Sequence, residues 1–145
     1  MFALGEHRWA AALGQNVNAT VYGTFFGFYG SYAVLSLGLT HNWFGIAADD
    51  TGGTVALWLT SWLVTIGILT VLLLRLPWTY PVLLLVVDIA LALLLIGNLT
   101  GSAVATQLGG WFVFVFVGFV AYFYAASLWE ETGGRALPLG RPVIE

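Results

Sequence analysis

One carboxylic acid, Asp88, stands near the middle of an otherwise aliphatic stretch of the chain. In the hydrocarbon layer of a membrane an ionised carboxylate costs about 2.5–3.5 kcal/mol, so such a residue usually faces a cavity or a partner. The other apolar stretches contain no Lys or Arg, so the chain offers Asp88 no ion-pair partner there. We expect Asp88 to be protonated much of the time. It then either binds and releases a proton as part of the protein's function or hydrogen-bonds a neighbouring helix and fixes its packing.

Other side chains that could do chemistry are scarce. The sequence has no Cys, and its two His, His7 and His41, lie far apart with no ligand motif around either. Thiolate sites and disulfides are therefore excluded, and we expect no metal site and no cofactor. Because the chain lacks a nucleophile–base constellation and a phosphate-binding loop, we expect no enzyme activity. A net charge of -3 without any Lys excludes the basic surface that binds nucleic acid.

The composition of the chain places it in a lipid bilayer. Hydrophobic residues make up 60% and charged residues 8%, whereas ordinary soluble domains are about 25% charged. A helix needs about 20 apolar residues to cross a hydrocarbon layer of about 30 Å. Four stretches reach or approach this length, at residues 17–39, 55–74, 80–96 and 103–128, of which the third is short. The sequence predicts an all-α, polytopic integral membrane helical bundle with four transmembrane helices in one domain, residues 1–145.

The positions of the arginines predict the orientation. With four spans, the two ends of the chain and the connection at residues 75–79 share one side of the membrane, and together they hold all four Arg: Arg8, Arg75, Arg135 and Arg141. The opposite side carries Asp49 and Asp50. Positively charged segments stay in the cytoplasm, so we expect a plasma-membrane protein with both termini cytoplasmic. The tight connection at residues 97–101 predicts that the third and fourth helices are antiparallel neighbours.

Several short motifs follow one another in a recognisable order. They are Ala3-Leu4-Gly5-Glu6, Phe28-Tyr29-Gly30-Ser31-Tyr32, Gly97-Asn98, Gly109-Gly110-Trp111, Ala121-Tyr122 and Gly134-Arg135-Ala136-Leu137-Pro138-Leu139-Gly140. The first resembles the end of the second helix of the acetate uptake transporter family, the YaaH-type acetate/succinate permeases, and the others, in this order, resemble helices three to six of that family. The Asn-Pro-Ala-Pro-Leu-Gly-Leu motif that opens the family's first helix does not occur in this sequence. We therefore expect that the chain lacks the first two helices of a six-helix permease fold.

The resemblance implies a function. It indicates transmembrane transport of small monocarboxylates or dicarboxylates such as acetate and succinate, either proton-coupled or channel-like. It also implies a homo-oligomer, since the family assembles as hexamers. The alternative is a non-transporting assembly subunit or a truncated remnant of the permease fold.

The resemblance also points to residues of a substrate path. Tyr29 matches the tyrosine of the family's narrow constriction, and Val87 falls where the family tends to have leucine. A ring of aromatic and aliphatic side chains gates by size and by excluding water, although Tyr29 could equally be a packed bundle residue. Asn98, with Thr100 and Ser102, could receive an anion at the start of the fourth helix. Simple turn chemistry explains this cluster equally well.

A stripe of small residues occurs in the first apolar stretch. Gly23, Gly27 and Ser31 are spaced four residues apart. This small-xxx-small pattern lets a second helix approach closely, so we expect these residues to serve helix packing.

Overall fold

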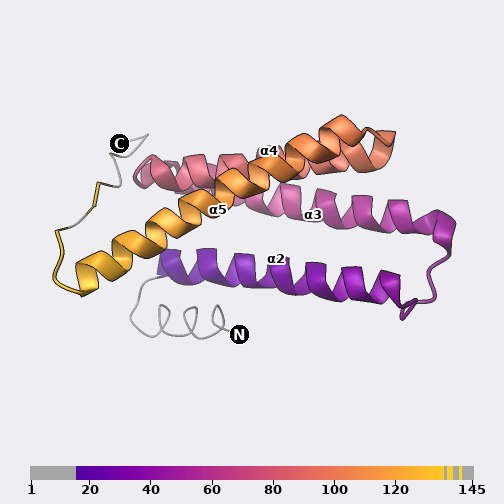
Figure 1. The fold of residues 1–145 in the computed structure, drawn as a ribbon, viewed down its shortest axis with the longest axis horizontal. Coiled ribbons are helices and arrows are strands. Elements are labelled where there is room, and N and C mark those ends of the chain that lie inside the picture. The colour runs from indigo at the N-terminus through magenta and orange to yellow at the C-terminus, as the bar shows by residue number, and fades with distance from the viewer. Residues whose placement is uncertain (1–15, 136, 139–140, 142–145) are drawn as a thin grey trace. The chain divides into compact units, whose positions relative to one another are not determined.

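The computed structural model describes residues 16–135, 137–138 and 141, which form helices joined by short connections. Four long helices follow one another: α2 (Asn16–Thr40), α3 (Thr51–Leu72), α4 (Thr79–Thr100) and α5 (Ala103–Glu131) (Figure 1). Two short 3₁₀ helices, η1 (Ala48–Asp50) and η2 (Leu73–Arg75), flank α3. The described residues contain no strand, and the predicted all-α class is confirmed.

Three of these helices are long and apolar enough to cross a membrane. Within the described part of the chain they run over Ala48–Arg75, Thr79–Thr100 and Ala103–Glu130. The fourth helix, α2, has 25 residues and is long enough to span. Its glycines, tyrosines and serines make it less apolar than the other three. The helical membrane architecture expected from the composition is thus present, and α2 is its least hydrophobic member.

Residues 1–51 and residues 52–145 form two compact units. In the first unit, α2 ends in a turn where Asn42 and Gly45 adopt positive φ angles of 54° and 61°. Gly38 is buried there because the ring of Phe44 folds back onto it. The second unit holds α3, α4 and α5. The expectation of one membrane domain over residues 1–145 stays a prediction, and the predicted tail around Arg8 lies outside the described residues.

The C-terminal end of α4 lies further along the chain than the sequence suggested. We expected this helix to stop at Ile96, before a glycine turn, but it continues to Thr100. Gly97 is a buried helical residue that faces Thr106 of α5, and Gly101, with a φ of 68°, provides the left-handed cap. The expectation of a short span at residues 80–96 was therefore wrong, because the 22-residue helix is long enough to cross the membrane.

Small residues allow α4 and α5 to pack closely. A Cβ atom at Gly109 would lie 2.9 Å from Leu94 Cγ and 3.2 Å from the carbonyl oxygen of Ala90. The chain reverses between the two helices over Gly101 and Ser102, whose side chain accepts a hydrogen bond from the backbone N–H of Ala105 at 3.3 Å. The antiparallel neighbours expected from the tight connection are therefore in contact along this seam.

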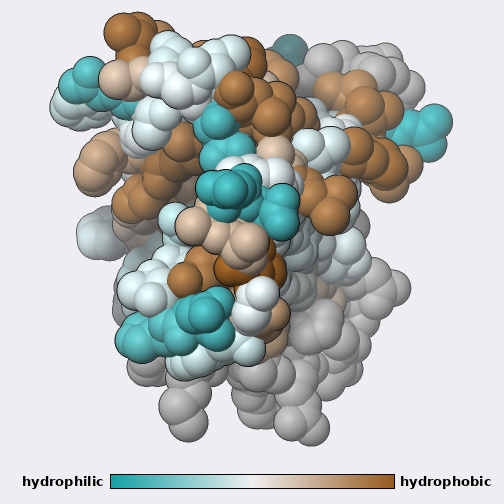
Figure 2. All heavy atoms as spheres, turned by 90° about the vertical axis from the view of Figure 1, so that its right-hand side faces the viewer, coloured by the Kyte–Doolittle hydropathy of each residue, from teal (hydrophilic) through white to brown (hydrophobic). Residues whose placement is uncertain are grey.

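Many large apolar side chains of α5 point outward. Phe114, for example, is 72% exposed, and Val104, Trp111 and Tyr124 are also largely uncovered. Such a surface would be unstable in water but suits the hydrocarbon layer of a membrane. Figure 2 shows the end of the molecule at which α4 turns into α5, where hydrophilic side chains in teal interrupt the brown apolar surface.

Candidate functional site

The carboxyl group of Asp88 contacts a hydroxyl group on the neighbouring helix. Asp88 lies near the middle of α4, and its Oδ2 is 2.7 Å from Oγ1 of Thr70 on α3. The same Thr70 oxygen lies 2.9 Å from the carbonyl oxygen of Ile66 in the preceding turn. The hydroxyl is thus held between a backbone acceptor and the carboxyl group, which connects α3 to α4 within the membrane-spanning segments.

The second carboxyl oxygen of Asp88 has different surroundings. Oδ1 is buried and has no hydrogen-bond partner among the described residues. Gly67 of α3 faces it, since a Cβ atom there would lie 4.0 Å from Oδ1. A buried oxygen without a partner is uncommon in folded proteins and costs about 1–3 kcal/mol. This orphaned oxygen distinguishes Asp88 from Thr60, Ser61 and Thr65 of α3, whose hydroxyls donate to backbone carbonyl oxygens one turn earlier.

Val87 and Asn98 occupy the same side of α4, because eleven residues make about three helical turns. Val87 is buried, with 6% of its surface exposed. Asp88 is rotated from this line by about 100° and turns toward α3. Three of the four expected pathway residues therefore lie on α4. Val87 and Asn98 share one side of this helix, and Asp88 lies on another.

The side chain of Asn98 is engaged in a contact between helices. Its Nδ2 donates to the carbonyl oxygen of Gly52 at 2.8 Å, which joins the C-terminal end of α4 to the start of α3. Thr100 donates to the Ile96 carbonyl oxygen at 2.7 Å, and Ser102 caps α5. These bonds match the turn-chemistry interpretation of the cluster, and they also occupy one donor of Asn98.

Tyr29 lies on α2, in the first unit. Its ring is 48% exposed and meets the ring of Phe28 edge-on, with the centroids 5.1 Å apart. Ser31, of the expected packing stripe with Gly23 and Gly27, bonds through its hydroxyl to the Phe28 carbonyl oxygen at 3.0 Å. The roles of Tyr29 in a substrate path and of the stripe in packing stay predictions.

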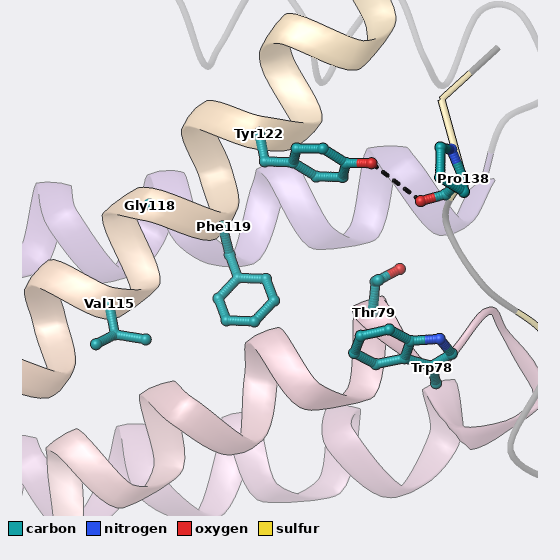
Figure 3. A pocket seen from close by; sticks show the side chains of 7 residues that line it. All are labelled: Trp78, Thr79, Val115, Gly118, Phe119, Tyr122 and Pro138. Carbon is teal, nitrogen blue, oxygen red and sulfur yellow. Dashed lines mark hydrogen bonds between the residues drawn. The ribbon is translucent and has the colours of Figure 1, made fainter.

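A pocket opens near the start of α4, at the end of the second unit opposite the α4–α5 connection. The C-terminal tail returns to the helices there (Figure 3). The pocket volume is about 400 Å³ and its lining is mainly apolar, from Trp78, Thr79, Val115, Gly118, Phe119, Tyr122 and Pro138. The Tyr122 hydroxyl donates to the Pro138 carbonyl oxygen at 3.0 Å across its edge. None of the four expected pathway residues lines this pocket, and no charged side chain there would bind an anion.

The return of the tail was not anticipated from the sequence. The backbone N–H of Trp78 donates to the carbonyl oxygen of Arg141 at 2.9 Å. Gly133, with a φ of 90°, turns the chain after α5 and makes this return possible. The glycine pair Gly133-Gly134 was the available signal for a turn, but nothing in the sequence specified the partner of the tail.

The arrangement around Asp88 can bind and release a proton, and it offers no set of metal ligands. Among the described residues, no group of three His, Cys, Asp or Glu side chains could hold an ion. Comparison with protein families matches residues 7–134 to the GPR1/FUN34/yaaH family. The chain belongs to the GPR1/FUN34/yaaH family.

GPR1/FUN34/yaaH proteins are membrane transporters, so the recognition made from the motif order is confirmed. The family is not an enzyme family, which agrees with the missing catalytic constellation. Neither the curated proteins nor the solved structures that were compared match the chain.

Proposed function

We propose that this GPR1/FUN34/yaaH protein carries small carboxylates, of the size of acetate or succinate, across the cell membrane. The observation that carries the proposal is the family match over residues 7–134. Transport is proton-coupled or channel-like, and the working unit is a homo-oligomer. A non-transporting assembly subunit is the alternative.

Tyr29, Val87 and Asn98 supply the contacts that a small carboxylate needs along its path. The phenol of Tyr29 offers one hydrogen bond to a carboxylate, and its half-exposed ring is accessible to a neighbouring surface. Val87 provides an aliphatic side chain that limits the size of the substrate that can pass. Asn98 offers an amide at the end of α4, where one of its N–H groups already bonds Gly52.

We propose that the end of the second unit that carries the tail lies in the cytoplasm. Arg75 ends η2, just before α4 begins. The hydrogen bond between Trp78 and Arg141 brings the tail to this same end. Three of the four Arg of the chain follow or precede helix ends here, which supports a cytoplasmic location through the positive-inside rule.

Uptake of labelled acetate and succinate into liposomes that contain the purified chain tests the proposal. Liposomes that contain the wild-type chain should take up the label faster than protein-free liposomes. The passive uptake of acetic acid by the protein-free liposomes is subtracted. Replacing Tyr29→Ala should lower the rate about tenfold or more, because a hydrogen bond to a charged group contributes about 1.5–3 kcal/mol.

The matched control is Tyr32→Ala, on the same helix and 52% exposed in the wild-type chain. An equal loss in both variants would contradict the pathway role of Tyr29. A well-folded wild-type chain without uptake would instead support the assembly-subunit alternative.

A further inference from the structure

When Asp88 is ionised, its carboxylate and the Ile66 carbonyl oxygen compete for the single hydroxyl hydrogen of Thr70. The Thr70 hydroxyl has one hydrogen, yet its oxygen lies 2.7 Å from Asp88 Oδ2 and 2.9 Å from the Ile66 carbonyl oxygen. With ionised Asp88, the hydroxyl can donate to only one of the two. With protonated Asp88, the carboxyl group donates to Thr70 and Thr70 donates to Ile66, so both short contacts become hydrogen bonds.

Helices α3, α4 and α5, as the structure describes them, carry no cation that could stabilise the ionised form of Asp88. Within the described helices α3, α4 and α5, Asp88 is the only Asp, Glu, Lys, Arg or His between Thr51 and Leu74, or between Thr79 and Trp129. Arg75 follows α3, and Glu130 lies at the end of α5. The other titratable residues of these helices are Glu130 and Glu131, which end α5, and the tyrosines Tyr80, Tyr122 and Tyr124.

Two residues of α3, Gly67 and Thr70, face the carboxyl group of Asp88. Gly67 leaves Oδ1 against bare backbone, and Thr70 supplies the hydroxyl for Oδ2 one turn later. A residue that only fixed packing would not need an ionisable group with one oxygen left unpartnered. With the proton on Oδ2, which faces Thr70, the unpartnered Oδ1 is a neutral carbonyl oxygen, whose burial costs less than that of a charged carboxylate oxygen.

We propose that Asp88 is the proton-binding site of the transport cycle and that Thr70 is its positioning residue. A proton binds the Asp88 carboxylate, and the Thr70 hydroxyl then turns its hydrogen from Asp88 to the Ile66 carbonyl oxygen. Release reverses both changes. The neutral form removes the repulsion that an ionised Asp88 would exert on a carboxylate beside it. This inference rests on the proposed function and specifies its coupling.

Succinate transport by the reconstituted full chain separates proton coupling from substrate movement. A gradient of one pH unit should let the wild-type chain raise the steady-state ratio of internal to external succinate up to about tenfold above that at equal pH, since one proton across one pH unit supplies about 1.4 kcal/mol. Asp88→Asn should lose this accumulation. An Asp88→Asn variant that keeps it would overturn the proposal. Failure of the proposed function looks different, because the wild-type chain would then show no exchange above protein-free liposomes.

The role of the hydroxyl has its own matched pair of variants. Thr70→Val removes a charge-assisted hydrogen bond from the ionised form and a weaker neutral one from the protonated form, so the pH of half-maximal uptake should rise by about one unit, and Thr70→Ser should restore it. Thr65 makes the same bond to the preceding turn, to Ser61, at 2.8 Å. Thr65→Val should leave the pH profile unchanged. Equal profiles in Thr70→Val and Thr65→Val would overturn the positioning role.

Infrared spectroscopy tests the proton site without requiring transport. The reconstituted wild-type chain should show a carbonyl band of a protonated carboxyl group that weakens as the pH rises and shifts in Thr70→Val. The absence of such a band at every pH would overturn the proposal. If Asp88→Asn fails to fold, the shift in Thr70→Val identifies the carboxyl group concerned, and an unshifted band would count against Asp88.

Discussion

At the scale of single residues, Asp88 and Asn98 show how position along one helix decides what a polar side chain does. Asp88 lies in the middle of α4 and keeps one carboxyl oxygen without a partner. Asn98 lies near the end of the helix and donates to the Gly52 carbonyl oxygen at 2.8 Å. Both side chains join α4 to α3, but Asp88 also keeps a buried acceptor without a partner among the described residues.

The Asn98 bond predicts a measurable loss of stability. Asn98→Ala should lower the free energy of unfolding by about 0.5–1.5 kcal/mol, because it removes a hydrogen bond between α3 and α4. Thermal unfolding in detergent measures the difference. Thr100→Ala is the control, since the Thr100 hydroxyl makes only local bonds, donating to the Ile96 carbonyl oxygen and accepting from the Ser102 N–H. A control that destabilises the chain as much as Asn98→Ala would contradict the bridging role.

At the scale of elements, the α4–α5 seam depends on glycine at the points of closest approach. The side chain of Thr106 and its backbone occupy the space beside Gly97, and Leu94 occupies the space beside Gly109. Interfaces between membrane helices gain their stability from such close packing, because lipid is as apolar as the side chains that it replaces.

Two adjacent glycines on α5 test this packing. Gly109→Ala should destabilise the chain by about 1–3 kcal/mol, because the new methyl group would overlap Leu94 and approach the Ala90 carbonyl oxygen. Gly110→Ala meets nothing within 4 Å, and helix propensity makes it neutral or slightly stabilising. Melting temperatures of the two variants in one detergent give the comparison. Equal melting temperatures would show that the seam tolerates a larger residue.

At the scale of the whole molecule, the described chain consists of helices whose outward faces suit lipid and whose charged residues, apart from Asp88, lie at or beyond the ends of the long helices. The two ends of the second unit differ in the number of arginines that they carry. The tail and the η2 turn carry Arg75, Arg135 and Arg141, whereas the α4–α5 connection carries none. This asymmetry is the basis of the proposed orientation.

The orientation can be tested by introducing single cysteines, since the natural chain contains none. Ala103→Cys, at the exposed start of α5, should react with a membrane-impermeant maleimide in intact cells. Leu137→Cys, in the exposed tail, should react only after the cells are permeabilised. The reverse labelling pattern would contradict cytoplasmic termini.

Much of the fold could be predicted from the sequence because the apolar stretches are long and nearly free of charge. The start of the last helix at Ala103 was predicted correctly. The end of α4 was not, because a glycine such as Gly97 can end a helix or can continue it where a neighbouring helix needs the space. That choice depends on Thr106 of α5, a contact that local sequence does not specify.

The candidate site shows the same division. The sequence by itself determined that Asp88 is an acid without a cation inside a membrane span, since only residue types and spacing are needed for that. Only the tertiary structure decided that Thr70 is its partner and that Gly67 leaves Oδ1 free. The physical reason is that a hydrogen bond between two helices depends on their relative rotation and shift, and these are set by packing along the whole length of both.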